Sequence, residues 1–182
     1  EKPAVVRRGS HRNGTFKAAF NHRMVFVYGT AGTKDENDWA YNKARYDAET
    51  WYYRGNGAVD IIPDSEFTPA GYADRGVVLF GNATTNSAWS ALLSQSPIQI
   101  QRGSIKVGED QLTGDNMGAY FTYPRPDSPS ASVAVVSGSG LAGMLATESN
   151  QYFTGGSGFP DYFIFGTDML KEGTKGVKLA GF

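Results

Sequence analysis

The sequence predicts an α/β fold in three layers: a mixed, mostly parallel sheet of about five core strands with helices on both faces, plus a β-hairpin insertion. Three observations support this prediction. A helical pattern separates the first two strand-like segments, which favours a right-handed parallel crossover. Apolar and polar residues alternate in the middle of the chain, as in an antiparallel hairpin. Five apolar runs resemble strands buried on both faces: Met24–Tyr28, Val59–Ile62, Val77–Phe80, Val133–Val136 and Tyr162–Phe165.

The first quarter of the chain contains a lead-in segment, a strand and a long helix. Residues 1–23 are basic and polar with little periodicity, so we expect a single α/β domain over residues 24–182. After the first strand, acidic residues between Thr33 and Asp38 favour a helix start, because acids stabilise the helix N-terminus. Alanines at helical spacing continue this helix to Tyr53, and the glycines that follow end it.

The middle of the chain contains the second helix and the insertion. Asn86 can cap a short helix over Ser87–Leu93, after the third apolar run. The alternating pattern then begins at Ile98 and continues through Ala119–Tyr123, so we expect the hairpin insertion over about residues 98–123. A third helix is predicted at Leu141–Thr147, and the tail after the last apolar run is glycine-rich and basic.

The apolar runs end in turns of glycine, proline and small polar residues. In open α/β sheets of the flavodoxin and Rossmann type, the ligand crevice lies outside the carboxyl ends of the strands. We therefore take these turns as candidate ligand-binding positions: Gly29, Thr30, Asp64, Gly81, Asn82, Ser137, Gly138, Ser139 and Gly140.

Residues 138–143 match the pattern G-x-G-x-x-G, which holds a pyrophosphate in dinucleotide-binding folds. That motif normally follows the first strand, but this copy follows a late one. The acid expected about 20 residues further on should end a strand, whereas Asp161 precedes one. A tight turn between a buried strand and a helix is the favoured interpretation, and we expect no cofactor.

The sequence provides no catalytic or metal-binding constellation. The nucleophile elbow G-x-S-x-G is absent, and both histidines, His11 and His22, precede the first core strand. There are no cysteines, and the isolated histidines and scattered acids do not form a ligand cluster. We therefore assign no catalytic residue and no metal site.

Composition excludes some partners. The formal net charge is −1 and no basic stripe is present, so nucleic acid is not an expected partner. No apolar stretch reaches the ~18 residues of a membrane span. The aromatic content of 13% and charged content of 19% favour a secreted or periplasmic protein, and the first residue, Glu1, suggests a mature product or an excised piece of a longer chain.

The order of segments resembles the C-terminal α/β domain of secreted bacterial prolyl-oligopeptidase-like or esterase-like proteins. In those proteins a catalytic α/β-hydrolase domain comes first. The resemblance runs from Lys2 to Tyr162 and rests on an ordered set of segments: Lys2-Pro3 through Arg8-Gly9, Met24–Tyr28, the helix with Ala44 and Trp51, Asp60 to Asp64, Val78 to Asn82, the helix ending near Pro97, Gly103 to Gly108, Tyr123 to Pro126, Val135 to Gly138 and Phe159 to Tyr162.

The resemblance implies a non-catalytic accessory domain whose partner is the catalytic α/β-hydrolase domain of the same polypeptide. Hydrolysis of ester or peptide bonds would then belong to residues upstream of Glu1. Two alternatives remain open. One is a small-molecule or saccharide-binding module that uses the strand-end turns, and the other is an atypical serine hydrolase around Ser137 and Ser139.

Overall fold

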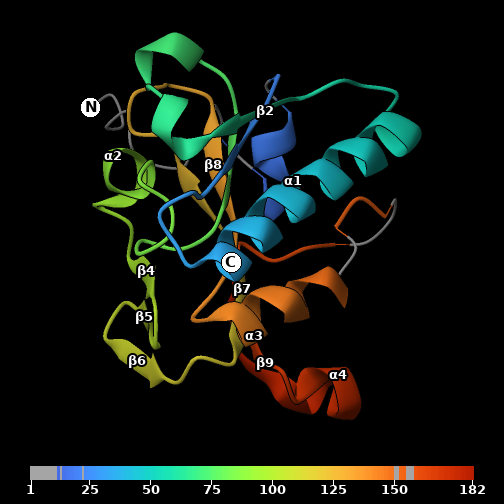
Figure 1. Cartoon of the computed structure of the whole chain (residues 1–182), viewed down its shortest axis with the longest axis vertical. Helices are drawn as coiled ribbons and strands as arrows, with labels where there is room; N and C mark the ends of the chain where they lie inside the picture. Colours follow the sequence, from blue (N-terminus) through green and yellow to red (C-terminus); the bar gives the residue numbers. More distant parts are fainter. Residues whose placement is uncertain (1–11, 13, 22, 150–151, 155–157) are drawn as a thin grey trace.

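The computed structural model describes residue 12 and residues 14–21, 23–149, 152–154 and 158–182 (Figure 1). Within them the chain forms a seven-stranded mixed sheet and a three-stranded antiparallel sheet. The large sheet contains β1 (Val25–Tyr28), β2 (Asp60–Pro63), β3 (Val77–Phe80), β7 (Met117–Pro124), β8 (Ser132–Gly138), β9 (Tyr162–Gly166) and β10 (Val177–Gly181). The small sheet contains β4 (Ile98–Gln101), β5 (Ser104–Val107) and β6 (Asp110–Thr113). The α-helices are α1 (Lys34–Gly55), α2 (Trp89–Leu93), α3 (Leu141–Ala146) and α4 (Met169–Glu172).

The large sheet has the strand order β10-β9-β7-β8-β3-β1-β2. Strands β2, β1, β3 and β8 are parallel to their neighbours in this half of the sheet. Strand β7 is antiparallel to both β8 and β9, and β10 is antiparallel to β9. The predicted mixed α/β sheet is thus confirmed, but it is parallel only over the half that the strand–helix–strand pattern covers.

The insertion is shorter than expected. Strands β4 and β5 form the predicted hairpin, and β6 adds a third antiparallel strand. Ala119–Tyr123, expected to continue the hairpin, instead lies within β7 of the large sheet. The residues from Met117 to Phe121 are all buried, because β7 has a paired strand on each side.

The tail contains a strand that the sequence did not predict. Val177–Gly181 forms β10 at the edge of the sheet, with residues that alternate between partly buried and exposed. An edge strand contacts one neighbour and is half solvated, so it needs no continuous apolar run. This tail and β7 raise the strand number of the large sheet from the expected five to seven.

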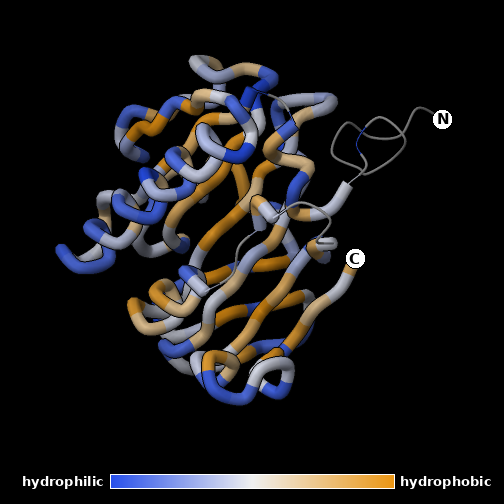
Figure 2. Tube along the Cα trace, turned by 90° about the vertical axis from the view of Figure 1, so that its right-hand side faces the viewer, coloured by the Kyte–Doolittle hydropathy of each residue, from blue (hydrophilic) through white to orange (hydrophobic). Residues whose placement is uncertain are grey.

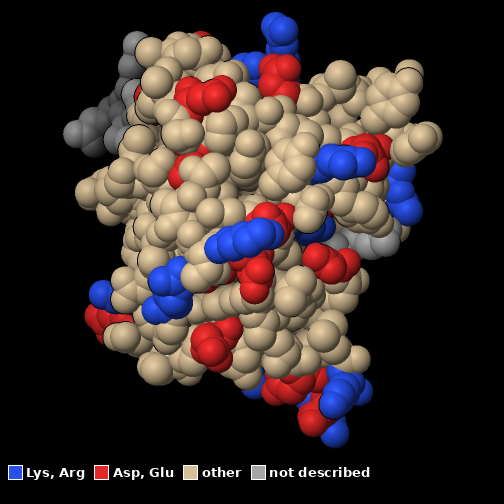
Figure 3. Space-filling model, viewed as in Figure 1, with Lys and Arg blue, Asp and Glu red and all other residues tan. Residues whose placement is uncertain are grey.

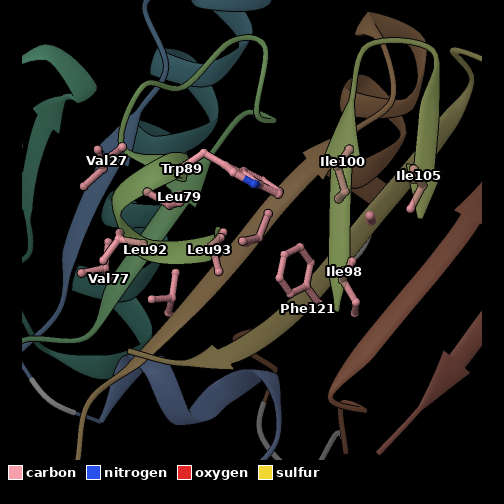
Figure 4. Packing of buried hydrophobic residues seen from close by; sticks show 14 of the residues in the cluster. Val27, Val77, Leu79, Trp89, Leu92, Leu93, Ile98, Ile100, Ile105 and Phe121 are labelled. Carbon is pink, nitrogen blue, oxygen red and sulfur yellow. The ribbon is translucent and has the colours of Figure 1, made fainter. Parts of the chain in front are cut away.

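Each face of the large sheet carries its own apolar cluster. The face we call the helix face packs against α1, α3 and the 3-10 helix η1 (Phe16–Phe20). The other face, the small-sheet face, packs against α2 and the small sheet. Figure 4 shows Trp89, Leu92 and Leu93 of α2 over the sheet. Figure 2 shows apolar residues concentrated along the strands.

The predicted lead-in segment contributes to the core. Residues 1–11, 13 and 22, and with them both histidines, lie outside the described residues. Phe16 and Ala19 of η1 are fully buried in the cluster of the helix face. The packed core therefore begins before residue 24.

The long helix begins where its acidic residues predicted. The Thr33 hydroxyl accepts a hydrogen bond from the Glu36 amide, and the Glu36 carboxylate accepts one from the Thr33 amide at 2.8 Å. This reciprocal capping box satisfies two amides of the first turn. Asn56, in a left-handed conformation, ends the helix.

Candidate functional site

The turns after β1 and β2 meet at Asp64. Its Oδ1 accepts hydrogen bonds from the Thr30 amide at 3.0 Å and from the Thr30 hydroxyl at 2.6 Å. Its Oδ2 accepts one from the Ser87 amide at 2.5 Å, just before α2. Asp64 is 3% exposed, so its carboxylate serves to join three chain segments at this end of the sheet.

Two asparagines connect the ends of the next strands. The Asn82 amide group donates to the Gly138 carbonyl at 2.9 Å, which links the end of β3 to the end of β8. The Asn86 amide group donates to the carbonyls of Val27 and Phe80, at 3.0 and 3.1 Å. Asn86, expected only as a helix cap, therefore also joins β1 to β3, where ligands bind in open α/β sheets.

The turn between β4 and β5 covers this strand-end region. The Arg102 guanidinium binds the Glu36 carboxylate through Nε and Nη2, at 3.2 and 2.6 Å. The Gly103 amide donates to the Ser139 carbonyl at 2.7 Å. Burial alone would raise the pKa of Glu36, but the hydrogen bonds from Arg102 and Thr33 lower it below its ordinary value. The contact thus ties the small sheet to α1 across the ends of the strands.

The nine candidate residues lie along one end of the parallel strands, as expected for strand-end turns. Only Thr30 is exposed to solvent, and the other eight are buried: Gly29, Asp64, Gly81, Asn82, Ser137, Gly138, Ser139 and Gly140. The backbone around residues 82–88 fills the space between the strand ends. A Cβ added at Gly29 would lie 2.3 Å from the Thr85 carbonyl oxygen. The side chains of Asp64, Asn82 and Asn86 at this end form hydrogen bonds with neighbouring turns and strand ends.

The glycines of G-x-G-x-x-G serve close packing. A Cβ at Gly143 would lie 2.0 Å from the Met117 carbonyl oxygen, and one at Gly138 would lie 2.4 Å from the Met144 nitrogen. The Ser139 amide donates to the same Met117 carbonyl at 2.9 Å. The start of β7 thus lies against the turn, and the glycines allow α3 to approach its backbone.

Replacing Gly143 with alanine is expected to lower the free energy of unfolding by about 1–3 kcal/mol, because the new methyl group overpacks against backbone. Alanine favours a helix over glycine by about 1 kcal/mol, so any loss reports the close contact. Chemical denaturation measures it. The control is Gly158→Ala, where no atom of the described residues lies within 4 Å of the new Cβ. Equal stability of the two variants would contradict the packing role.

The two candidate serines are not arranged as nucleophiles. The Ser139 hydroxyl accepts a hydrogen bond from the Met117 amide at 3.2 Å. The Ser137 hydroxyl is buried and has no hydrogen-bond partner in the part of the chain that the structure describes. Neither side chain is exposed, and among the described residues neither is hydrogen-bonded to a carboxylate. A serine nucleophile needs an adjacent base to be activated.

A buried ionic cluster formed by Lys43 and Asp47 of α1 with Tyr152 was not predicted from the sequence. The Lys43 ammonium lies 2.7 Å from Oδ1 of Asp47, and both side chains are 3% exposed. The Tyr152 hydroxyl donates to Oδ2 of Asp47, and the ammonium lies 5.1 Å from the centre of the Tyr152 ring. Burial raises the pKa of Asp47 to about 6, although Lys43 opposes this shift. The sequence signal was available: Lys43 and Asp47 lie four residues apart on the helical face that also carries Ala40 and Ala44.

The described part of the chain holds no group of three or more histidine, cysteine, aspartate or glutamate side chains able to bind a metal ion. In the same residues no helix is both long and apolar enough to cross a membrane. On the face shown in Figure 3, acidic and basic side chains are interspersed. Comparison with protein-family models and with curated proteins finds no match for this chain.

Proposed function

We propose that this chain is a non-catalytic accessory domain of a larger secreted or periplasmic hydrolase. The ester or peptide bond chemistry would belong to an α/β-hydrolase domain of the same polypeptide, as the resemblance in segment order implies. The observation that carries the proposal is the outer surface of α1, which exposes aromatic side chains suited to contact with another domain.

Four tyrosines of α1 are exposed to solvent. The exposed fractions are 44% for Tyr41, 54% for Tyr46, 62% for Tyr52 and 84% for Tyr53. A hollow of about 540 Å³ next to the last two is lined by residues of α1, of the segment leading into β2 and of β2 itself, including Arg45, Glu49 and Ile61. We call this hollow and the four tyrosines the tyrosine surface. Tyrosine and arginine are enriched where proteins bind one another.

The strand-end region also supports this proposal, because its polar side chains have structural roles. Asp64, Asn82 and Asn86 use their side chains to join strands and turns, as described above. Such groups stabilise the fold, and they do not form an open site with a nucleophile and a base. A domain of this kind contributes to hydrolysis through its contacts with the domain that holds the catalytic residues.

We also infer that the domain has three layers with a flavodoxin- or Rossmann-like parallel half. In the order β2-β1-β3-β8, the next two parallel strands of the chain, β2 and β3, lie on either side of β1. Doubly wound sheets have such a reversal of strand order. The apolar clusters on both faces of the sheet support the same inference.

Hydroxyl-radical footprinting of the full polypeptide that contains this chain tests the proposal, because it reports side-chain exposure directly. We expect Tyr52 and Tyr53 to react in the isolated chain and to be protected in the full polypeptide. Leu170 of α4, 56% exposed, serves as the control and should react equally in both.

Equal reactivity of the tyrosines in the two samples would contradict an interface at the tyrosine surface. The gene provides a separate check on the catalytic partner. We expect a domain with G-x-S-x-G upstream of Glu1, and a gene that starts at this chain would overturn the accessory role.

A further inference from the structure

We propose that the hollow between the middle of α1 and the 3-10 helix η4 (Thr147–Ser149) is a binding site for a neutral saccharide of one or two rings. We call it the α1–η4 hollow. It is lined by Asn42, Lys43 and Tyr46 of α1 and by Glu148 of η4. Figure 1 shows α1 and α3, which leads into η4, side by side over the sheet. The inference does not depend on the accessory role proposed above.

The floor of the hollow contains a buried ammonium with unused donors. The side chain of Lys43 is 3% exposed, and its Nζ lies 2.7 Å from Oδ1 of Asp47. An ammonium has three N–H donors, and no second acceptor for this one is present among the described residues. The rings of Tyr46 and Tyr152 lie 5.7 and 5.1 Å from it, and rings attract a cation without accepting a full hydrogen bond. A ligand oxygen in the hollow can therefore accept a charge-assisted hydrogen bond from Lys43.

The rim of the hollow has hydrogen-bonding groups that the rest of the described chain leaves open. Asn42 and Glu148 are exposed, and within the described residues their side chains have no hydrogen-bond or ion-pair partner. A carboxamide donates and accepts, whereas a carboxylate only accepts. Each hydroxyl of a saccharide also donates and accepts, so neighbouring hydroxyls can bind Lys43, Asn42 and Glu148 at the same time.

The Tyr46 ring forms an apolar wall of the hollow. Its side chain is 54% exposed, so much of the ring is open to a ligand. The C–H groups of a pyranose pack on aromatic rings, which have a large apolar body and a polar tip. The hollow has a volume of about 370 Å³, and small-molecule sites range from about 300 to 1,000 Å³. This size and lining suit one or two sugar rings.

The charges around the hollow favour a neutral ligand. Lys43 and Asp47 balance each other, and Glu148 adds one negative charge at the rim. Burial raises the pKa of Asp47 to about 6, and the charge of Glu148 adds to this rise, so the two carboxylates are close enough to interact. An anionic substituent is repelled by Glu148, and a cationic one at the floor meets the ammonium of Lys43.

The probes are glucose, glucuronate and 6-amino-6-deoxyglucose, which share a pyranose ring and differ in charge at C6. In ¹H–¹⁵N NMR titrations of this chain, glucose should give saturable shifts with a Kd of about 1 mM, as expected for about twelve heavy atoms. The largest shifts should lie at residues 42–47 and 148. Glucuronate and the amino sugar should each bind at least about threefold more weakly, because each places a like charge near one of the lining groups.

Two single variants separate the parts of the site. Tyr46→Ala should weaken glucose binding about tenfold or more, because the apolar wall is lost. Its matched control is Tyr53→Ala, another exposed tyrosine of α1 that lies outside the hollow and should leave glucose binding unchanged. Glu148→Gln keeps an acceptor but removes the charge, so glucuronate should then bind as tightly as glucose.

The double variant Lys43→Met with Asp47→Asn removes the donor at the floor without leaving an unpaired charge. It should lose saturable glucose binding, with circular dichroism to check its fold. Absence of saturable shifts with glucose, shifts centred outside the hollow, tighter binding of either charged sugar, or an unchanged affinity in Tyr46→Ala would overturn the proposal. These readouts are separate from the protection of Tyr52 and Tyr53, so a failed domain interface and a failed saccharide site are distinguishable.

Discussion

Replacing Arg125 with methionine is expected to lower the free energy of unfolding by about 3–5 kcal/mol, because three backbone carbonyls lose the donor that satisfies them. Arg125 is fully buried at the end of β7. Its Nε and Nη2 donate to the two carboxylate oxygens of Asp127, at 2.7 and 2.8 Å. Its guanidinium also donates to the carbonyls of Pro69, Tyr72 and Arg75.

The loss has a clear physical origin. The guanidinium holds the loop between β2 and β3 against the end of β7, and methionine fills its volume but leaves those carbonyls without a donor. Buried acceptors that lose their partner keep their full desolvation cost. Urea denaturation monitored by circular dichroism gives the free energy of unfolding.

Two further variants sharpen this test. Arg125→Lys retains the charge but lacks the planar fork, so it should fall between the wild type and Arg125→Met. Arg45→Met breaks an exposed pair with Glu49 and should match the wild type. A loss below about 1 kcal/mol in Arg125→Met would show that the loop is held by other contacts.

The buried pair of Lys43 and Asp47 is expected to make stability depend on pH between about 4 and 6. Burial raises the pKa of Asp47 from 3.8 to about 6, while the unfolded chain keeps the ordinary value. The folded state therefore binds more protons than the unfolded state within this window. The stability that this group contributes is complete below about pH 4 and is lost as the pH rises through about 6, up to about 3 kcal/mol in total.

A variant with both charges removed isolates this effect from the other acids. In Lys43→Met combined with Asp47→Asn, an amide oxygen still accepts from Tyr152, and replacing both charges of a buried pair is often neutral or stabilising. Urea denaturation at several pH values should give a wild-type curve that falls, relative to the variant, as the pH rises from 4 to 6. A constant difference between the two curves would refute the raised pKa.

Lys43→Met alone should have the larger effect at neutral pH. It removes the attraction that lowers the pKa of Asp47, so the window extends above pH 6. At pH 7 we expect a loss of about 3–5 kcal/mol, because a buried carboxylate is left unpaired. The exposed acid Asp38, on the same helix, provides the control Asp38→Asn, which should keep the wild-type pH dependence.

The parts of the fold that the sequence predicted are those with a local signal. The long helix begins where its acidic residues predicted, because the Thr33–Glu36 capping box acts within one helical turn. The parallel strands β1, β3 and β8 are continuous apolar runs because both of their faces are covered. In contrast, Val177–Gly181 has no strong run, since an edge strand pairs with one neighbour only.

The candidate site shows the same division. The sequence placed Asp64, Asn82 and Ser137 at one end of the sheet, because the carboxyl ends of parallel strands share an edge. It could not show that the loop after β3 and the Arg102 turn cover that edge. Those contacts join residues far apart in the chain, such as Glu36 and Arg102, and depend on where the insertion folds back.

The sequence by itself determined the α/β class, the parallel half of the sheet and the start of the long helix. These follow from hydrophobic periodicity and capping, which act over short stretches of chain. Only the tertiary structure decided that β7 belongs to the large sheet, that the strand-end residues are buried, and that Lys43 and Asp47 form a buried pair. The ring contacts among Phe20, Trp51 and Phe153 were also decided there, because these residues become neighbours only when three distant segments pack together.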